Sequence, residues 1–384
     1  MLTYGRETRE TPPLSTLSAL NCKSVRKSAG RAQGREPLLT FTDSKMGNSI
    51  PLMECPLRIV VISRPNDPWL EELVHLPPEA RIIATGDSLE ALLANGGRLF
   101  TEGNVLFFAY GAAAQLGPIV QNMPFLDWIH CFFAGIDHIV CPELLDQSEV
   151  IATNARGIFS SSLAEYTMMA IAYFNKDLPR LLKNKNEKAY ERFTIGEMRG
   201  KTVGIIGYGD IGRSVAVLAK AYGMRVVGMR KHPDLSSKDP LLDRVCGQQG
   251  VNSICAESDF LVVCAALTKE TRHIIGKAQL AACKPGCVLI NIGRGALIDE
   301  EALIVSLVQG PLIGAALDVF TTEPLPPDSP LWTLPNVLIS PHNADMTADF
   351  RHKSVKLFTD LCKQYIEQGG AGNLSNQVDV SSGY

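Results

Sequence analysis

Short runs of β-branched and other apolar residues recur along the chain from residue 57 onward, and their starts lie 21–24 residues apart. Each interval leaves room for a helix between successive runs. Strands joined by helices imply a parallel sheet with crossover connections. The five predicted strands of this first α/β unit are 57–62, 81–85, 104–108, 128–132 and 149–153.

A second series of apolar runs follows a predicted helix that covers residues 162–178. The Ser162-x-x-Glu165 spacing predicts a capping box at the start of this helix, and Pro179 predicts its end. Six parallel strands with helical spacers form a complete dinucleotide-binding architecture. The predicted strands are 202–206, 225–229, 259–264, 288–292, 314–320 and 337–340.

The order of these elements predicts two domains of the α/β class. A helix is predicted over 347–368, where it returns the chain to the first unit. We therefore expect a Rossmann dinucleotide-binding domain at 156–344, inserted into a flavodoxin-like substrate domain at 56–155 plus 345–384. The chain of 384 residues is long enough for both, since a domain takes about 100–200 residues.

Residues 1–45 have a different composition from the rest of the chain. Between Thr11 and Arg35 there are five basic residues and no acidic one, among many Ser, Thr, Ala and Gly. Such a segment cannot bury a core, so it is expected to be a disordered extension or a transit peptide. A transit peptide would direct the protein to a plastid or mitochondrion; otherwise a cytoplasmic location is expected.

Charge and hydropathy limit the classes of partner. The net charge is −3, which gives no basic field for nucleic acid. No stretch approaches the roughly 18 consecutive apolar residues of a membrane span. The cysteines show no spacing typical of metal ligands, so no metal site is expected. A small-molecule substrate is the expected partner, rather than nucleic acid or a membrane.

A glycine-rich turn follows the first strand of the second series and opens the next predicted helix. In this context the first glycine allows a tight turn, the second lets a pyrophosphate approach the backbone, and the third lets helix and strand pack closely. The helix N-terminus offers unpaired N–H groups to the phosphates. The predicted cofactor-binding residues of this turn are Gly207, Tyr208, Gly209, Asp210, Ile211 and Gly212.

The end of the following strand bears on the choice between NAD and NADP. An acidic residue there would bind the ribose 2′-hydroxyl of NAD. The chain instead has Arg230 and Lys231, and no acid occurs before Asp234. Two cations suit a 2′-phosphate, which favours NADP over NAD unless both side chains point into solvent.

The last three predicted strands are each followed by one charged or titratable residue, namely Arg294, Glu323 and His342. Ligands bind beyond the carboxyl ends of parallel strands, so these side chains should meet at one edge. A histidine can donate the proton that a carbonyl oxygen gains on reduction, and a carboxylate stabilises the imidazolium. A guanidinium can bind the carboxylate of the substrate. The set predicts reduction of a 2-oxo acid or oxidation of a 2-hydroxy acid.

With these motifs the chain resembles the D-isomer-specific 2-hydroxyacid dehydrogenases over about 56–384. The matching stretches are 204–212, 284–295, 314–324 and 340–342. The resemblance implies that His342 is the acid/base, Glu323 supports it and Arg294 orients the substrate. It further implies that Asp318 meets the nicotinamide carboxamide and that the protein is a homodimer joined through its nucleotide domains.

The resemblance also assigns residues around the cofactor and substrate. Ala266 lies in a loop near the cofactor, at a position where the family usually has Pro. The loop of Ala134, Gly135 and Ile136 would offer backbone N–H groups to the substrate carboxylate. Two further departures are Phe133-Ala134 in that loop and Asn343-Ala344-Asp345 after the histidine.

The loops expected to face the substrate, 110–115 and 132–135, contain no Lys or Arg. Tyr110, Phe132 and Phe133 would line a neutral pocket there, with Arg156 as the nearest base. A buried phosphate would lack a partner, so unphosphorylated 2-oxo acids such as hydroxypyruvate and glyoxylate are the expected substrates. Two alternatives stay open: a phosphoglycerate dehydrogenase, and a non-catalytic nicotinamide sensor resembling the corepressors of this fold.

Overall fold

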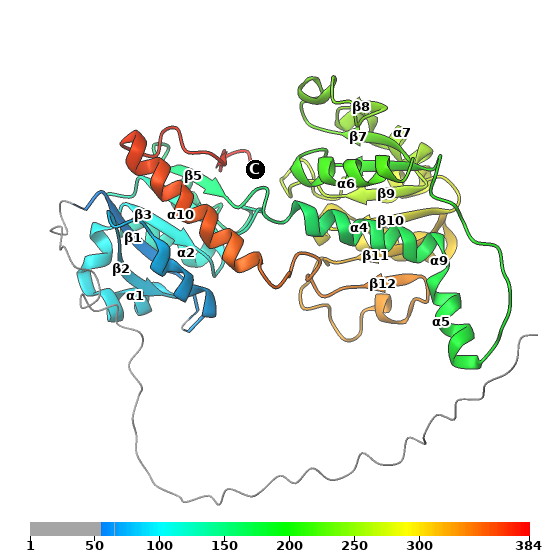
Figure 1. The fold of residues 1–384 in the computed structure, drawn as a ribbon, viewed down its shortest axis with the longest axis horizontal. Helices are drawn as coiled ribbons and strands as arrows, with labels where there is room; N and C mark the ends of the chain where they lie inside the picture. Colours follow the sequence, from blue (N-terminus) through cyan, green and yellow to red (C-terminus); the bar gives the residue numbers. More distant parts are fainter. Residues whose placement is uncertain (1–54, 65) are drawn as a thin grey trace, which may run out of the picture. The chain divides into compact units, whose positions relative to one another are not determined.

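The computed structural model describes residues 55–64 and 66–384, so the predicted extension 1–45 lies outside the described residues. The described strands form two sheets (Figure 1). The first has the order β13-β5-β4-β3-β1-β2, which contains the 2-1-3-4-5 order of flavodoxin-like sheets. Its strands are β1 (Leu57–Ile62), β2 (Ala80–Gly86), β3 (Val105–Phe108), β4 (Trp128–Cys131), β5 (Ile151–Asn154) and the antiparallel β13 (Gln377–Val378).

The two faces of the first sheet are covered by different helices. Alternate residues of a strand point to opposite faces. Accordingly Ile59 packs in the cluster that contains Phe358 of α10 (Phe350–Gln368), whereas Val60 packs with Leu92 and Leu116. Leu92 belongs to α1 (Leu89–Gly96) and Leu116 to α2 (Ala113–Gln121), with the short α3 (Pro142–Leu145) beside them.

The second sheet is parallel throughout and has the order β12-β11-β10-β9-β6-β7-β8. This is the Rossmann order of 3-2-1-4-5-6 with one further strand, and it confirms the predicted fold class. Seven strands are present rather than the predicted six, because the three-residue β8 is too short to show a pattern. The strands are β6 (Thr202–Ile206), β7 (Arg225–Met229), β8 (Arg244–Cys246), β9 (Phe260–Val263), β10 (Cys287–Asn291), β11 (Leu312–Leu317) and β12 (Val337–Ile339).

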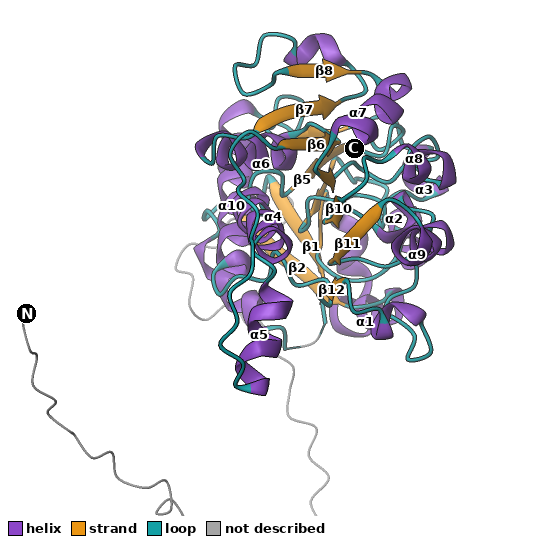
Figure 2. Ribbon diagram, turned by 90° about the vertical axis from the view of Figure 1, so that its right-hand side faces the viewer, coloured by secondary structure: helices purple, strands orange, loops and turns teal. Residues whose placement is uncertain are grey.

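Helices cover both faces of this second sheet (Figure 2). On one face α4 (Ser160–Asn175) packs against α6 (Asp210–Ala221). The other face is covered by α7 (Val251–Glu257), α8 (Lys277–Ala282) and α9 (Glu300–Gln309). The exact boundaries of the two domains stay a prediction.

The helices observed around residues 160–187 differ in detail from the single helix predicted at 162–178. Here α4 begins at Ser160, and the Ser162 hydroxyl donates to the Ala344 carbonyl at 2.6 Å instead of capping its own helix. The capping-box prediction was therefore wrong. Pro179 does not end α4 but lies in the first turn of α5 (Leu178–Glu187), where its missing N–H costs no hydrogen bond. Similarly α10 begins at Phe350, three residues later than predicted.

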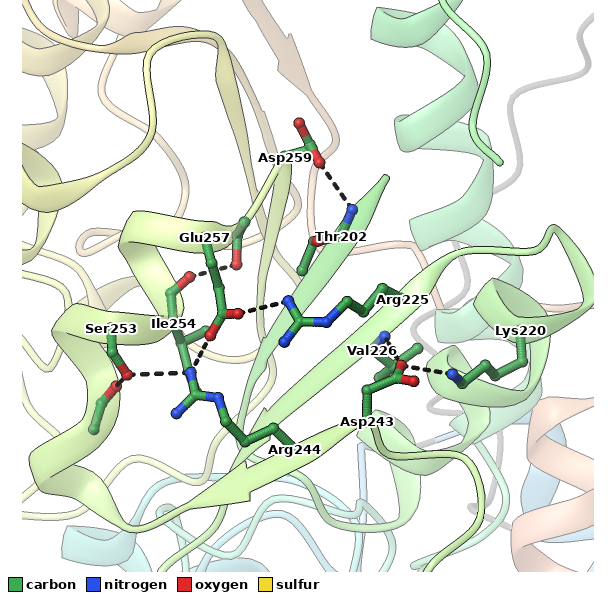
Figure 3. A network of polar contacts seen from close by, with 12 residues as sticks. Thr202, Lys220, Arg225, Val226, Asp243, Arg244, Ser253, Ile254, Glu257 and Asp259 are labelled. Atoms are coloured by element: carbon green, nitrogen blue, oxygen red, sulfur yellow. Dashed lines mark hydrogen bonds and ion pairs between the residues drawn. The ribbon is translucent and has the colours of Figure 1, made fainter. Parts of the chain in front are cut away.

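Polar contacts join β7, β8 and α7 at the edge of the second sheet (Figure 3). Glu257, at the end of α7, accepts from Arg225 of β7 at 2.6 Å and also pairs with Arg244 of β8. Asp243 accepts from the Val226 N–H at 2.7 Å and pairs with Lys220. These contacts attach the short edge strand to the sheet at the amino end of β7, opposite the strand end that Arg230 follows.

Candidate active site

One cavity of about 1160 Å³ contains most of the predicted site residues. It is lined by residues that follow the carboxyl ends of β6, β7 and β9–β12, and by the loops after β4 and β5. This is the edge at which open α/β sheets bind their ligands. The volume is generous for a dinucleotide together with a small substrate.

The glycine turn after β6 fits a dinucleotide. Gly207 has φ 103°, and a Cβ there would collide with the Ala265 backbone. Gly209 has nothing within 4 Å of the position of a Cβ, so the backbone is open to a close ligand. Gly212 packs against Ile205 and the Gly207 carbonyl. The turn leads into α6, whose first residues line the cavity.

Two neighbours of this turn have structural partners. The Tyr208 ring is buried, and its hydroxyl donates to Asp239 at 3.1 Å. The Asp210 carboxylate accepts a hydrogen bond from Ser160 on α4. Both residues still line the cavity, as does Ile211. In the loop after β9, Ala266 lines the cavity and its carbonyl accepts from Thr271 at 2.7 Å.

Both cations that follow β7 line the cavity. The Arg230 guanidinium donates to the buried Ser236 hydroxyl at 2.6 Å. The Lys231 ammonium lies 5.1 Å from the centroid of the Tyr384 ring, within the range of a cation–π interaction. Sequence reasoning missed Tyr384, which also lines the cavity.

The catalytic candidates come from three adjacent strands, β10, β11 and β12. His342 Nδ1 lies 2.8 Å from Glu323 Oε2, and the other oxygen of Glu323 accepts from the Phe320 N–H at 2.9 Å. The hydrogen bond to Glu323 raises the pKa of His342 despite its partial burial. Burial alone would raise the pKa of Glu323, but the contacts with His342 and Phe320 outweigh it and the pKa is lowered. The pair therefore favours a protonated imidazole.

A buried aspartate holds the turn that carries His342. His342 has φ 53°, a conformation that is uncommon for residues other than glycine. Its N–H donates to the Asp318 carbonyl at 2.8 Å, and the Asp318 carboxylate accepts from the N–H groups of Asn343 and Ala344. Asp318 also lines the cavity, and its contact with the nicotinamide carboxamide stays a prediction. Its contacts show that it orders the histidine turn as well.

Arg294 has a partner that sequence reasoning missed. Its guanidinium lies 3.1 Å from Asp137, which follows the loop after β4. Burial alone would raise the pKa of Asp137, but Arg294 outweighs it and the pKa is lowered. A Cβ at Gly135 would overlap the Arg294 guanidinium, so a larger residue there would displace that group from its observed position. The signal in the sequence was weak, since Asp137 stands next to His138 and far from Arg294.

The predicted substrate loop is in place with two corrections. Ala134, Gly135 and Ile136 line the cavity. Gly111 lines it rather than Tyr110, whose ring lies 4.6 Å from the guanidinium carbon of Arg64. Phe132 also does not line the cavity, because its side chain is buried in the hydrophobic core.

The aromatic rings beside the loop belong to the core of the first sheet. The Phe132 ring packs 5.2 Å from that of Trp69. His130 is fully buried, which lowers its pKa to about 3, and it stacks on Phe107. Phe133 and Arg156 do line the cavity, so its wall is less neutral than the loops 110–115 and 132–135 suggested.

Neither a metal site nor a membrane span is found in the part of the chain that the structure describes. Residues 55–64 and 66–384 contain no group of three potential metal-ligating side chains. No helix within the same ranges is long and apolar enough to cross a membrane.

The fold and this site define the class of nicotinamide-dependent, two-domain α/β proteins, and comparison with known proteins gives the family. Residues 167–344 match the model of the D-isomer specific 2-hydroxyacid dehydrogenase, NAD binding domain. A glyoxylate reductase of Aeropyrum pernix is 30% identical over 273 residues, which cover 68% of this chain and 80% of that relative. The chain belongs to the D-isomer specific 2-hydroxyacid dehydrogenase family.

Other relatives match over part of their own length. A D-3-phosphoglycerate dehydrogenase of Methanocaldococcus jannaschii is 32% identical over 82% of this chain, but the match spans 59% of that relative. A glyoxylate/hydroxypyruvate reductase B of Pectobacterium carotovorum is 43% identical over 42% of this chain and 54% of the relative. Among solved structures, a family member from Xanthobacter autotrophicus in complex with NADPH and MES has a TM-score of 0.72 at 25% identity, covering 85% of this chain and 99% of that one.

Proposed function

We propose that this chain reduces small unphosphorylated 2-oxo acids, foremost hydroxypyruvate and glyoxylate, to the corresponding 2-hydroxy acids with NADPH, and that it forms the D isomer where C2 becomes chiral. The observation that carries the proposal is the 2.8 Å contact of His342 with Glu323, in one cavity with Arg294 and the glycine turn. These are the groups that such a reduction requires from a protein: a proton donor, a carboxylate-binding cation and a dinucleotide site.

The chemistry follows from the contacts of each side chain. The bound nicotinamide would supply the hydride that reduces C2 of the substrate. Because His342 Nδ1 is committed to Glu323, its Nε2 is the nitrogen left to give a proton to the carbonyl oxygen. Arg294 binds the substrate carboxylate and polarises the carbonyl, sharing its guanidinium with Asp137.

Two observations support NADPH as the cofactor. Arg230 and Lys231 both line the cavity at the end of β7, where an acid would select NAD. The solved relative from Xanthobacter autotrophicus is a complex with NADPH. The two cations would balance the negative charge of a 2′-phosphate, whereas an uncharged 2′-hydroxyl does not need them.

Oxidation or reduction of a phosphorylated substrate is the second candidate. It is favoured by the likeness to a D-3-phosphoglycerate dehydrogenase and by Arg156, which lines the cavity. A panel of 2-oxo acids assayed with NADPH and NADH separates the candidates. We expect hydroxypyruvate or glyoxylate to exceed 3-phosphohydroxypyruvate in kcat/KM by at least about tenfold, equivalent to about 1.4 kcal/mol. A preference for the phosphorylated acid would identify the second candidate, and no turnover at all would favour a nicotinamide sensor.

We also propose that the protein works as a homodimer. Helix α5 exposes three leucines on its surface, Leu178, Leu181 and Leu182. Exposed apolar groups of this kind are typical of an interface, and a second copy is the simplest occupant for the predicted contact through the nucleotide domains. Light scattering of the full chain should give twice the monomer mass, and L181E together with L182E should reduce it to the monomer. A monomeric wild-type protein would contradict the proposal.

A further inference from the structure

Six acidic side chains line the cavity, and five of them already have partners. Asp137 pairs with Arg294, Glu323 with His342, and Asp318 with the histidine turn. Two more of the five, Asp210 and Glu270, lie on the cofactor side of the cavity. Asp210 accepts a hydrogen bond from Ser160, and Glu270 accepts one from Thr268. The sixth is Asp345. Within residues 55–64 and 66–384, no other residue donates a hydrogen bond to its carboxylate or forms an ion pair with it, although its own backbone N–H contacts the carboxylate. The Asp345 main-chain carbonyl accepts from the Thr347 N–H at 2.8 Å.

Asp345 is held close to the reacting groups. It follows Ala344, whose N–H is bonded to the buried Asp318, and it stands three residues after His342. The side chain is half-buried, and burial raises its pKa. His342 and Arg294 lie near enough to act on it electrostatically. The Asp345 oxygens are not among the buried atoms that lack a hydrogen-bond partner. A substrate that covers this carboxylate must nevertheless donate a hydrogen bond to it, because an acceptor that is buried without a partner is costly.

The other groups in the cavity restrict what this donor can be. Arg294 takes the carboxylate at C1 of a 2-oxo acid and His342 the oxygen at C2, so the part of the substrate left for Asp345 is the substituent at C3. Arg156 lines the same cavity and disfavours a cationic substituent. The negative charge of Asp345 disfavours a phosphate. A neutral hydroxyl satisfies both conditions.

We infer that Asp345 is a specificity-determining residue that accepts a hydrogen bond from a hydroxyl group on C3, which makes 3-hydroxy-2-oxo acids the preferred substrate class. This inference rests on the proposed function.

Three 2-oxo acids that differ only at C3 test the inference: hydroxypyruvate has a hydroxyl there, pyruvate a methyl hydrogen, and glyoxylate no C3. With NADPH, the wild-type full chain should prefer hydroxypyruvate over pyruvate by at least about tenfold, because a site built for a hydroxyl rejects the analogue that lacks it. D345A should lower this ratio about tenfold, and D345N, which keeps an acceptor oxygen, should retain most of it. The matched control is D349A, which removes an exposed acid paired with Lys353 and should leave the ratio unchanged.

Each other outcome overturns the inference in a recognisable way. An unchanged hydroxypyruvate/pyruvate ratio in D345A would show that Asp345 does not read C3. An equal loss on all three substrates, glyoxylate included, would show that it acts through His342. If 2-oxo-5-guanidinovalerate were the best substrate and D345A abolished that preference, the partner of Asp345 would be a cation. Failure of the wild-type protein to reduce any 2-oxo acid would overturn the proposed function itself, and melting temperatures of the variants identify any that do not fold.

Discussion

His342 carries the proposed chemistry because its environment fixes both its protonation and its position. Glu323 holds Nδ1, and the backbone of Asp318 holds the turn in a conformation with positive φ. Residues in such strained conformations persist only where their surroundings determine them, and they cluster at functional sites. H342A should lower kcat by roughly 10²–10⁴ with a smaller effect on KM, which steady-state kinetics on hydroxypyruvate would measure. Near-full activity in this variant would remove His342 from its assigned role.

The Glu323 contact predicts a pH dependence whose sign can be worked out. Glu323 raises the pKa of His342, so the protonated imidazole persists to higher pH than in a free histidine. Reduction needs that proton, and kcat/KM should therefore fall as the pH rises through the raised pKa. In E323Q the charge is lost, and the fall should move to lower pH. A pH profile of the variant that overlays the wild-type profile would mean that the acid is another group.

At the scale of the elements, the proposed preference for NADPH depends on the end of β7. Arg230 and Lys231 follow this strand directly, and Tyr384 lies against the ammonium of Lys231. R230D together with K231A should shift the NADPH/NADH ratio of kcat/KM toward NADH by at least about tenfold, since each lost phosphate contact removes a charge-assisted hydrogen bond. R192A with K183A, which removes two bases outside the cavity, is the matched control. An unchanged ratio in the first variant would show that the two cations do not bind the 2′-phosphate.

The opposite, amino end of β7 depends on Glu257, which joins this strand to β8. Its carboxylate is bonded to Arg225 and Arg244, and all three side chains are partly exposed. The variant E257Q removes this charge and should lower the free energy of unfolding by about 1 kcal/mol, which is the upper range for exposed ion pairs. The corresponding decrease in Tm is about 2–4 °C. Differential scanning fluorimetry would detect this shift. E197Q, at an exposed glutamate outside the network, should leave Tm unchanged, and a loss of the same size in both variants would contradict the role of the network.

At the scale of the whole molecule, the sequence predicted what depends on local pattern and strand order. Arg294, Glu323 and His342 could be found because each directly follows a strand, and parallel strands deliver their carboxyl ends to one edge. Asp137 could not be found in this way, because its contact with Arg294 spans 157 residues and depends on how two loops meet. The predictions for the capping residue of α4 and for Tyr110 were wrong for the same reason. Ser162 contacts Ala344 and Tyr110 contacts Arg64, and only the tertiary structure brings these partners near.

The last prediction concerns residues 1–45, whose composition contains too few apolar groups to add to either core. A chain that begins at Met46 should therefore retain its Tm within about 2 °C, a change below 1 kcal/mol, and its kcat/KM within about twofold. Circular dichroism and the hydroxypyruvate assay would measure both. Soluble protein with full activity would agree with a transit peptide or a disordered extension, and fusing 1–45 to a fluorescent protein would separate the two by its location. Loss of soluble enzyme on truncation would show instead that the extension contributes to the fold.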